Sequence, residues 1–497
     1  MFSELGISSE DWERTPPAVQ TVVLSLQHQL RLFQIRHTGY EQQLAALGEK
    51  VTQIDDLQAE LIELRERVNQ NSRNSSKPPS SDPPHQKPSP PNAPSGRKQG
   101  AQPGHHGAGR KFKPAEEVDT VIELRPTSCR ACGQTLEGDD AHPGRHQVAE
   151  VPCARAEVTE YRQHTLRCGA CGAANRAELP AALPRGSFGA RAQAIIGYLT
   201  GRLHASHRDA AEAMRVLHGL DLSIGSVAAI QQQVSEALAE PVRCARHFVE
   251  RQQSQHVDET GWRERGRRNW LWVNTTREVT VFHLLGGRST KEAQRVISSA
   301  TKSIITTDRY AVYNWLCATR RQICWAHLSR DFQAMVERGA ESAKTGQALL
   351  EQSRNLFTLW HRVRDSTLSR TQFQAEMKSI RLQIKDLLEA GSRSAQAKTR
   401  RTCQNILKVE ESLWTFARVE GVEPTNNMAE RALRRAVLWR RKSFGTQSEA
   451  GSRFVERILS VITTLRQQGR DVLDYLTAAC ASALPDGASI CPLPDSS

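Results

Sequence analysis

Two short cysteine motifs of the same form constrain the fold of this chain more than any other feature. Cys129 and Cys132 form one CxxCG motif, and Cys168 and Cys171 form a second. The glycine of each motif permits a tight turn that presents two thiolates, and four thiolates complete the tetrahedral shell of a zinc ion. We therefore predict one structural Zn ion, held by these four cysteines in a small zinc-ribbon-like β domain.

Two redox-active pairs and four unligated thiols are the alternatives for these motifs. Eleven cysteines in 497 residues are too sparse for a disulfide scaffold. Four side chains between the motifs could each replace one ligand: His142, His146, Cys153 and His164. Around the motifs, 118–124 and 156–168 alternate in polarity, and we expect short strands there. A segment with so few large apolar residues needs the metal in order to fold.

The N-terminal part of the chain carries a heptad pattern. Between residues 20 and 69, apolar side chains recur at alternating steps of three and four: Leu26, Leu30, Phe33, Tyr40, Leu44, Leu47, Val51, Ile54, Leu61 and Val68. One narrow apolar stripe along a long helix is typical of a coiled coil. We expect a homodimer through this helix; the alternative is a helix that packs on its own domain.

Charge points to a polyanionic partner. The formal net charge is +13, and nucleic acid is the first candidate for such a chain. Residues 71–114 hold ten of the 22 prolines, eight basic residues and one acid, which predicts a basic linker that does not fold alone. No apolar run reaches the roughly 18 residues of a spanning helix, and the N-terminus lacks a secretion signal. We expect a cytoplasmic, nucleoid-associated protein with no membrane partner.

The rest of the chain alternates between helical and strand patterns. We expect helices over 186–250 with a break at 218–221, strands and one helix over 255–335, polar helices over 340–420, and helices over 425–482. Residues 206–217 and 224–238 form a candidate helix-turn-helix, in which Ser223, Ser226 and Gln231 to Gln233 could meet bases. Helix pairs of this kind also occur in folds that never bind DNA.

Three acids stand where a metal site would need them. Asp258 ends a predicted strand at 255–257, and Asp308 ends an apolar, β-branched strand at 303–307. Acids at strand ends gather at the rim of a sheet and can share a divalent cation. Glu430 falls in the first turn of a helix that Asn426 or Asn427 can cap. Each acid alone is explained by a turn or a cap; the three together favour a metal site.

Cations and a histidine surround these acids in the sequence. Six cations follow Glu430 within twelve positions without one acid, and they suit phosphate binding: Arg431, Arg434, Arg435, Arg440, Arg441 and Lys442. His327 lies just beyond a predicted strand at 322–325. It either contacts a phosphate of a bound nucleic acid, supports one of the acids, or packs at a strand end.

Several short motifs follow one another in a characteristic order. They are 74–82 (NSSKPPSSD), 102–105 (QPGH), 256–260 (HVDET), 308–310 (DRY), 324–327 (CWAH) and 426–431 (NNMAER). Together with the heptads and the cysteine pairs, these motifs make the chain resemble the bacterial insertion-sequence transposases of the sixty-six family, which carry a DDE triad. The resemblance covers nearly the whole chain. The chain departs from many relatives at 261–265 (GWRER), which lacks their proline and longer hairpin.

The resemblance implies a multidomain α+β chain with a ribonuclease H-like α/β catalytic core and a helical insertion. Its parts would be 1–70 coiled coil, 71–114 linker, 115–180 zinc-binding domain, 181–252 helical region, 253–335 first part of the core, 336–422 insertion, 423–482 helices with the third acid, and 483–497 tail. Carried over position by position, Asp258, Asp308 and Glu430 become the triad. Neighbouring residues of a strand point to opposite faces, so only one of Asp258 and Glu259 can join the site. The resemblance selects Asp258.

The implied activity is metal-dependent cleavage and strand transfer at the ends of the element that encodes the chain. Two Mg (or Mn) ions would be held by the triad, and the partners would be double-stranded DNA at the element ends and the target. Accessory proteins of the same element are also implied. The alternatives are a zinc-ribbon DNA-binding regulator without catalysis and a metal-dependent nuclease without strand transfer.

Overall fold

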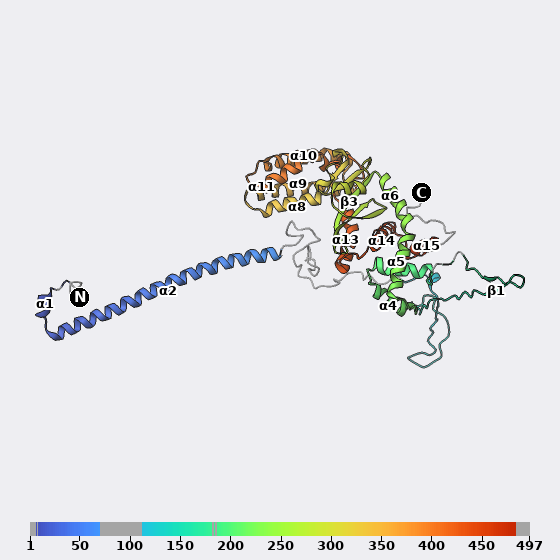
Figure 1. Ribbon diagram of the computed structural model, residues 1–497, viewed down its shortest axis with the longest axis horizontal. Helices are drawn as coiled ribbons and strands as arrows, with labels where there is room; N and C mark the ends of the chain where they lie inside the picture. The colour runs from blue at the N-terminus through green and yellow to red at the C-terminus, as the bar shows by residue number, and fades with distance from the viewer. Residues whose placement is uncertain (1–5, 7, 70–111, 181–182, 184–185, 484–497) are drawn as a thin grey trace. The chain divides into compact units, whose positions relative to one another are not determined.

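The computed structural model of the chain describes residues 6, 8–69, 112–180, 183 and 186–483 (Figure 1). The chain divides into two units, Met1–Gln86 and Lys87–Ser497. The predicted basic linker at 71–114 lies outside the described residues except for 112–114. The predicted tail at 483–497 lies outside them except for Ala483.

The first unit contains a short helix, α1 (Ser9–Glu13), and a long one, α2 (Pro17–Asn69). Proline suits the first position of a helix because its missing N–H would have no partner there. The described apolar side chains of the heptad are exposed in this single chain, with exposed fractions of 52% to 67%: Leu26, Leu30, Phe33, Leu47 and Ile54. Apolar side chains in such a row favour a partner that covers them; the predicted homodimer stays a prediction.

The cysteine-containing segment has far less strand than the alternation predicts. Among its described residues, only β1 (Thr165–Arg167) and β2 (Ala174–Arg176) pair as strands, and they are antiparallel. The strands predicted at 118–124 and 156–164 are wrong. The physical reason is that no residue in 112–180 is buried, so the alternating apolar side chains have no core face to cover.

Helices follow from residue 190 onward, as predicted. They are α3 (Ala190–Arg202), α4 (His207–His218), α5 (Ile224–Ala237) and α6 (Ala239–Arg251). Ser206 and Asp209 form a capping box at the start of α4, and Gly219 ends it in the left-handed conformation with φ 64°. The break predicted at 218–221 is therefore confirmed.

A five-stranded mixed sheet forms the centre of the second unit. Its strands are β3 (Ser254–Glu264), β4 (Arg267–Thr275), β5 (Thr280–Leu285), β6 (Ile304–Thr307) and β7 (Arg321–Ile323), in the order β5-β4-β3-β6-β7. β3, β4 and β5 are antiparallel neighbours, whereas β6 and β7 run parallel to β3. Helix α7 (Thr290–Val296) connects the two halves of the sheet. The strands and the helix expected between 255 and 323 are confirmed, although β7 ends at Ile323, two residues before the predicted strand end.

The predicted polar helices have a core of their own. They are α9 (Ala340–Arg364), α10 (Arg370–Gly391), α11 (Ala397–Leu407) and α12 (Thr415–Arg418), with a short 3-10 turn at 410–413. They share this core with α8 (Trp325–Glu337), a helix that begins inside the region where strands and only one helix are predicted; 3-10 turns at 311–313 and 318–320 precede it. Leu356, Phe373 and Ile384 are among the side chains buried between them. Helices α8 and α9 approach so closely that a Cβ at Gly346 would lie 2.7 Å from the Phe332 carbonyl oxygen.

Three helices complete the second unit: α13 (Asn427–Ser443), α14 (Glu449–Gln467) and α15 (Val472–Ser482). Side chains of α14 cover the free edge of β5, since Ser460 Oγ accepts the Phe282 N–H at 2.9 Å and Glu456 Oε1 accepts the Leu284 N–H at 2.7 Å. A sheet edge satisfied in this way is closed to further strands. Figure 1 shows α13 beside β3. None of the described helices is long and apolar enough to cross a bilayer.

Candidate active site

Parallel pairing of β3, β6 and β7 brings the two candidate aspartates, Asp258 and Asp308, and Cys324 into one row across the sheet. The last pair between β3 and β6 joins residues 256 and 306, and the last between β6 and β7 joins 307 and 323. Continued two positions beyond its last pair, the β3–β6 register sets Asp258 opposite Asp308; continued by one position, the β6–β7 register sets Asp308 opposite Cys324. Neighbouring strands are about 4.8 Å apart, so this register brings the two aspartates to the edge where the parallel pairing ends, the place where ligands collect in α/β sheets.

Asp258 itself does not end a strand, contrary to the prediction. β3 continues to Glu264 because its second half forms a hairpin with β4, and the turn uses Arg265 and Gly266 with φ 49° and 74°. The parallel pairing of β3 with β6, by contrast, ends at His256. The Asp258 side chain therefore still lies at the rim formed by the parallel strands.

The environment of Asp258 is crowded with negative charge. Its Oδ1 accepts the backbone N–H of Glu259 at 2.9 Å. Burial, followed by the charges of Glu259 and Asp308, raises the pKa of Asp258 well above its ordinary value, and Glu430 adds to the rise. A carboxylate held among like charges is favoured in its ionised form when a cation binds beside it.

Glu259 points to the opposite face of β3 and already has two partners. Arg288 Nε donates to its Oε1 at 2.6 Å, and the Tyr313 hydroxyl donates to its Oε2. The Arg288 guanidinium lies 3.9 Å from the ring centre of Tyr310 and 4.8 Å from that of Trp270. With no exposed side-chain surface, Glu259 belongs to the packing of the sheet, which favours Asp258 as the acid that is open to a ligand.

Asp308 directly follows β6, as predicted. Its Oδ1 accepts the Tyr310 N–H at 3.0 Å. Arg321 on β7, only 2% exposed, donates to the Asp308 carbonyl oxygen at 3.0 Å and to Thr307 Oγ1 at 3.1 Å. Burial lowers the pKa of Arg321 to about 10, so the guanidinium stays charged at neutral pH. This buried cation fixes the backbone on which Asp308 stands.

Helix α13, which carries Glu430, is fastened to the rim by Asn426. The Asn426 side-chain amide donates to the Val257 carbonyl oxygen at 2.8 Å, and its backbone N–H donates to Cys324 Sγ at 3.1 Å. The predicted side-chain cap is wrong: α13 begins at Asn427 with Asn426 as N-cap but without a side-chain cap bond, because the amide is used to hold β3. Glu430 lies in the first turn, as predicted.

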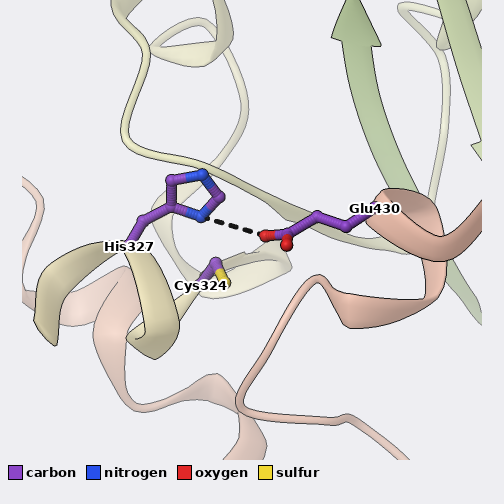
Figure 2. Close-up of side chains that lie close together, drawn as sticks. All are labelled: Cys324, His327 and Glu430. Carbon is purple, nitrogen blue, oxygen red and sulfur yellow. Dashed lines mark ion pairs between the residues drawn. The ribbon is translucent and has the colours of Figure 1, made fainter. Parts of the chain in front are cut away.

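Cys324, His327 and Glu430 converge beside the rim (Figure 2). His327 Nδ1 lies 3.5 Å from Glu430 Oε1, and both atoms are buried without a hydrogen-bond partner. Arg330 lies 3.8 Å from the same oxygen. One ligand atom of each of the three lies within 4.8 Å of the others, and no second such trio of His, Cys, Asp or Glu occurs among the described residues. The oxygens of the three predicted triad acids are thus not all within that distance.

His327 lies in the first turn of α8 rather than beyond a strand. The prediction is corrected because β7 already ends at Ile323. Burial and the charge of Arg330 lower the pKa of His327, and burial raises the pKa of the Cys324 thiol to about 11. Mg²⁺ prefers oxygen ligands, so the neutral imidazole and the protonated thiol are better suited to orient Glu430 and α13 than to bind that ion.

The six predicted DNA-binding cations of α13 lie in different environments. Arg431, Arg434, Arg441 and Lys442 are exposed, whereas Arg435 and Arg440 are partly buried. Arg440 donates to Thr260 Oγ1 at 3.1 Å and to the Gly261 carbonyl oxygen, so it fastens α13 to β3. Three of the others line a cavity of about 520 Å³ together with Arg202 and His204: Arg431, Arg434 and Arg435.

The candidate helix-turn-helix has the predicted bounds, but its polar residues are engaged within the fold. Ser223 accepts the Ser226 N–H at 3.0 Å as the N-cap of α5. Gln231 forms a 2.8 Å hydrogen bond with His207. Val227 and Ile230 on the same helix are buried in the core. Reading of DNA bases by this pair of helices stays a prediction.

Each cysteine motif forms the predicted turn. The Gly133 N–H donates to the Cys129 carbonyl oxygen at 2.8 Å, and the Gly172 N–H donates to that of Cys168 at the same distance. Backbone N–H groups of these turns lower the pKa of Cys129 and Cys168. The structure brings each pair together, but no three of the four sulfur atoms lie within 4.8 Å of one another in the described segment.

No sequence pattern predicts several of the side chains that support the candidate site. Arg288 and Tyr313 contact Glu259 across 29 and 54 residues, and no local pattern joins positions so far apart. Asn426 and Cys324 do fall inside the motifs NNMAER and CWAH. The motifs therefore carry a signal for them, although not for the bond between the two.

The sequence matches place this chain in a family of transposases. The family model described as "Transposase IS66 family" matches residues 185–453, more than half of the chain and all three acids. The chain belongs to this family, and the expected sixty-six family membership is confirmed. A family of unknown function (DUF6444) matches residues 18–111.

One curated relative of this chain is known only as an uncharacterized protein. It is y4qI of Sinorhizobium fredii (strain NBRC 101917 / NGR234), 26% identical over 231 residues. The match covers 42% of this chain and 42% of that protein. The chain therefore spans less than half the length of this relative, whose printed name assigns no activity.

Proposed function

We propose that this chain is a DDE transposase that cleaves and joins DNA at the ends of its own insertion sequence. The observation that carries the proposal is the parallel pairing of β3 with β6, whose register, continued two positions beyond its last pair, would set Asp258 beside Asp308. Helix α13 carries Glu430 to the same rim through the Asn426 bond to β3. A ribonuclease H-like core is part of this proposal, and the mixed sheet with its acids on adjacent strands supports it.

The donor set fits divalent cations. Asp258, Asp308 and Glu430 offer carboxylate oxygens, which Mg²⁺ and Mn²⁺ prefer, and Glu430 Oε1 is buried without a hydrogen-bond partner. Two bound ions would supply charge that stabilises the extra negative charge on phosphorus during cleavage and joining. Asp258 and Asp308 would hold them from the sheet and Glu430 from the helix. His327 and Arg330 orient the Glu430 carboxylate from α8.

The proposed partner is double-stranded DNA at the element ends and at the target. The exposed cations of α13, such as Arg431 and Arg434, support contacts with phosphates beside Glu430. The exposed heptad side chains of α2 support a homodimer, and accessory proteins of the same element would complete the assembly.

Incubation of the purified chain with a supercoiled plasmid carrying the element ends tests the function. We expect Mg²⁺-dependent strand cleavage at the ends and joining of the freed ends to a second DNA, both read on gels. Without added Mg²⁺ neither product is expected. Binding without cleavage would identify a regulator instead, and cleavage without joining would identify a nuclease.

We also propose that the two cysteine motifs hold one structural Zn²⁺. The support is that both turns are formed, while the described residues of 112–180 include no buried side chain that could form a core. We expect about one zinc per chain in the purified protein, and Cys168→Ser should lower it nearly to zero while exposing 112–180 to proteases. Cys317→Ser, which removes an exposed thiol outside the motifs, should leave the zinc content unchanged. Equal zinc in both variants would contradict the site.

A further inference from the structure

The turn of the β3–β4 hairpin and the end of α13 together form a basic surface with an exposed aromatic ring. We call this surface the hairpin face; its exposed side chains are Arg263, Arg265, Arg267, Arg268, Arg441, Lys442 and Phe444. Phe444 is 78% exposed. Glu264 and Glu449 are the acids of these two segments, so six cations stand against two acids.

Backbone contacts hold the two segments of the hairpin face together. The Thr446 N–H donates to the Arg263 carbonyl oxygen at 2.9 Å, and the Arg265 N–H donates to that of Thr446 at 2.9 Å. At Gly445, with φ +114°, a Cβ would lie 2.1 Å from the Arg263 carbonyl oxygen. Only glycine permits this approach. Phe444 is therefore presented from a fixed backbone.

Two residues of the hairpin face adopt a backbone conformation that glycine would adopt more easily. Phe444 has φ 59° and Arg265 has φ 49°. Left-handed conformations are unfavourable for bulky L residues and concentrate where a side chain serves a function. A third such residue, His204 with φ 56°, accepts a 3.5 Å bond from Lys442 Nζ through its carbonyl oxygen. Strained backbone thus surrounds the end of α13.

We propose that the hairpin face binds a DNA strand and that Phe444 stacks on a base that has left the duplex stack. Aromatic rings stack on base faces regardless of sequence, and flanking arginines follow the phosphates. Phe444 directly follows the last residue of α13 and lies fourteen residues after Glu430, or about 21 Å along the helix at 1.5 Å per residue. That length corresponds to roughly six base steps. The inference rests on the proposed function, since it assumes a DNA substrate at the three acids.

Binding assays without added divalent metal test the proposal. Three probes share one element-end sequence: an intact duplex, a duplex with one mismatched step, and the single strand. Phe444→Ala should weaken binding of the single strand and the mismatched duplex about tenfold, with little change for the intact duplex. It should leave the slope of log affinity against log salt unchanged, whereas Arg267→Gln should reduce that slope by about one.

Matched variants separate stacking from a general surface effect. Leu382→Ala removes an apolar side chain of α10 that is 62% exposed and should change none of the three affinities. Phe444→Trp should retain binding, whereas Phe444→Gly should weaken it while raising the unfolding midpoint in urea. Unchanged binding by Phe444→Ala, or an equal loss on all three probes, would overturn the proposal. Because no cleavage is required, these results do not depend on the plasmid assay.

Discussion

Replacement of Asp258 by asparagine is expected to abolish DNA cleavage and at the same time to stabilise the fold. Asparagine keeps the shape of the side chain but loses the negative charge that a cation needs. Cleavage should fall by about a thousandfold or more, the scale on which removal of a catalytic group acts. The free energy of unfolding should rise by about 0.5–2 kcal/mol, because the substitution removes a charge that is crowded by Glu259 and Asp308.

The gain in stability should depend on pH in one direction. The folded pKa of Asp258 is raised, whereas the unfolded value is about 3.9. Below the unfolded value the carboxyl group is protonated in both states, so the variant has no advantage. As the pH rises from there through the folded pKa, the wild-type chain must either keep a proton or bury a charge, and the advantage of asparagine grows to its full size.

Urea unfolding at pH 4 and pH 8, without added divalent metal, measures this advantage. Asp365→Asn makes the same chemical change at an exposed position, where the side chain is 61% exposed, and should shift neither value by more than about 0.5 kcal/mol. Asp308→Asn should reduce DNA cleavage to a similar extent as Asp258→Asn. An Asp258→Asn chain that cleaves DNA normally, or that is no more stable than wild type at pH 8, would contradict the assignment.

The positions of the strands could be predicted from the sequence because β-branched and apolar runs mark them, as in β6. The register in which the strands pair could not be predicted. The parallel pairing that sets Asp258 beside Asp308 joins Ser254 to Ile304 across fifty positions, and no local pattern encodes such a pairing. Sequence reasoning therefore found the two acids, while their adjacency follows only from the order β3-β6-β7.

The errors have local physical causes. The alternation at 118–124 predicts a strand, but a strand needs a core face, and this segment has none. The chain leaves the sheet after β7 because the Cys324 N–H still donates to Thr307 at 2.8 Å, whereas the Trp325 N–H donates to Pro424 at 2.9 Å. That change of partner moves His327 from a strand end into a helix. In each case a tertiary partner decided between two locally acceptable conformations.

The strongest effect on stability is expected at Glu259, which the family resemblance does not include among the three catalytic acids. Glu259→Ala should lower the free energy of unfolding by about 2–3 kcal/mol, because it leaves the charge of Arg288, whose side chain is 29% exposed, without its partner. The Tyr313 hydroxyl would lose its acceptor as well. Glu259→Gln should cost less, about 1–2 kcal/mol, since the amide oxygen can still accept from Arg288 and the amide N–H can donate to the Tyr313 hydroxyl oxygen.

Urea unfolding of the two variants beside Glu240→Ala measures these differences. Glu240 forms an ion pair with Arg243 in which the side chains are 44% and 62% exposed, and an exposed pair of this kind contributes little to stability because water screens it. Arg288 contacts the ring of Tyr310, whose N–H holds Asp308, so Glu259→Ala should also weaken cleavage under conditions where the chain is still folded. A Glu259→Ala chain as stable as Glu240→Ala would show that Arg288 finds another partner and that the Glu259 contacts do not support the active-site rim.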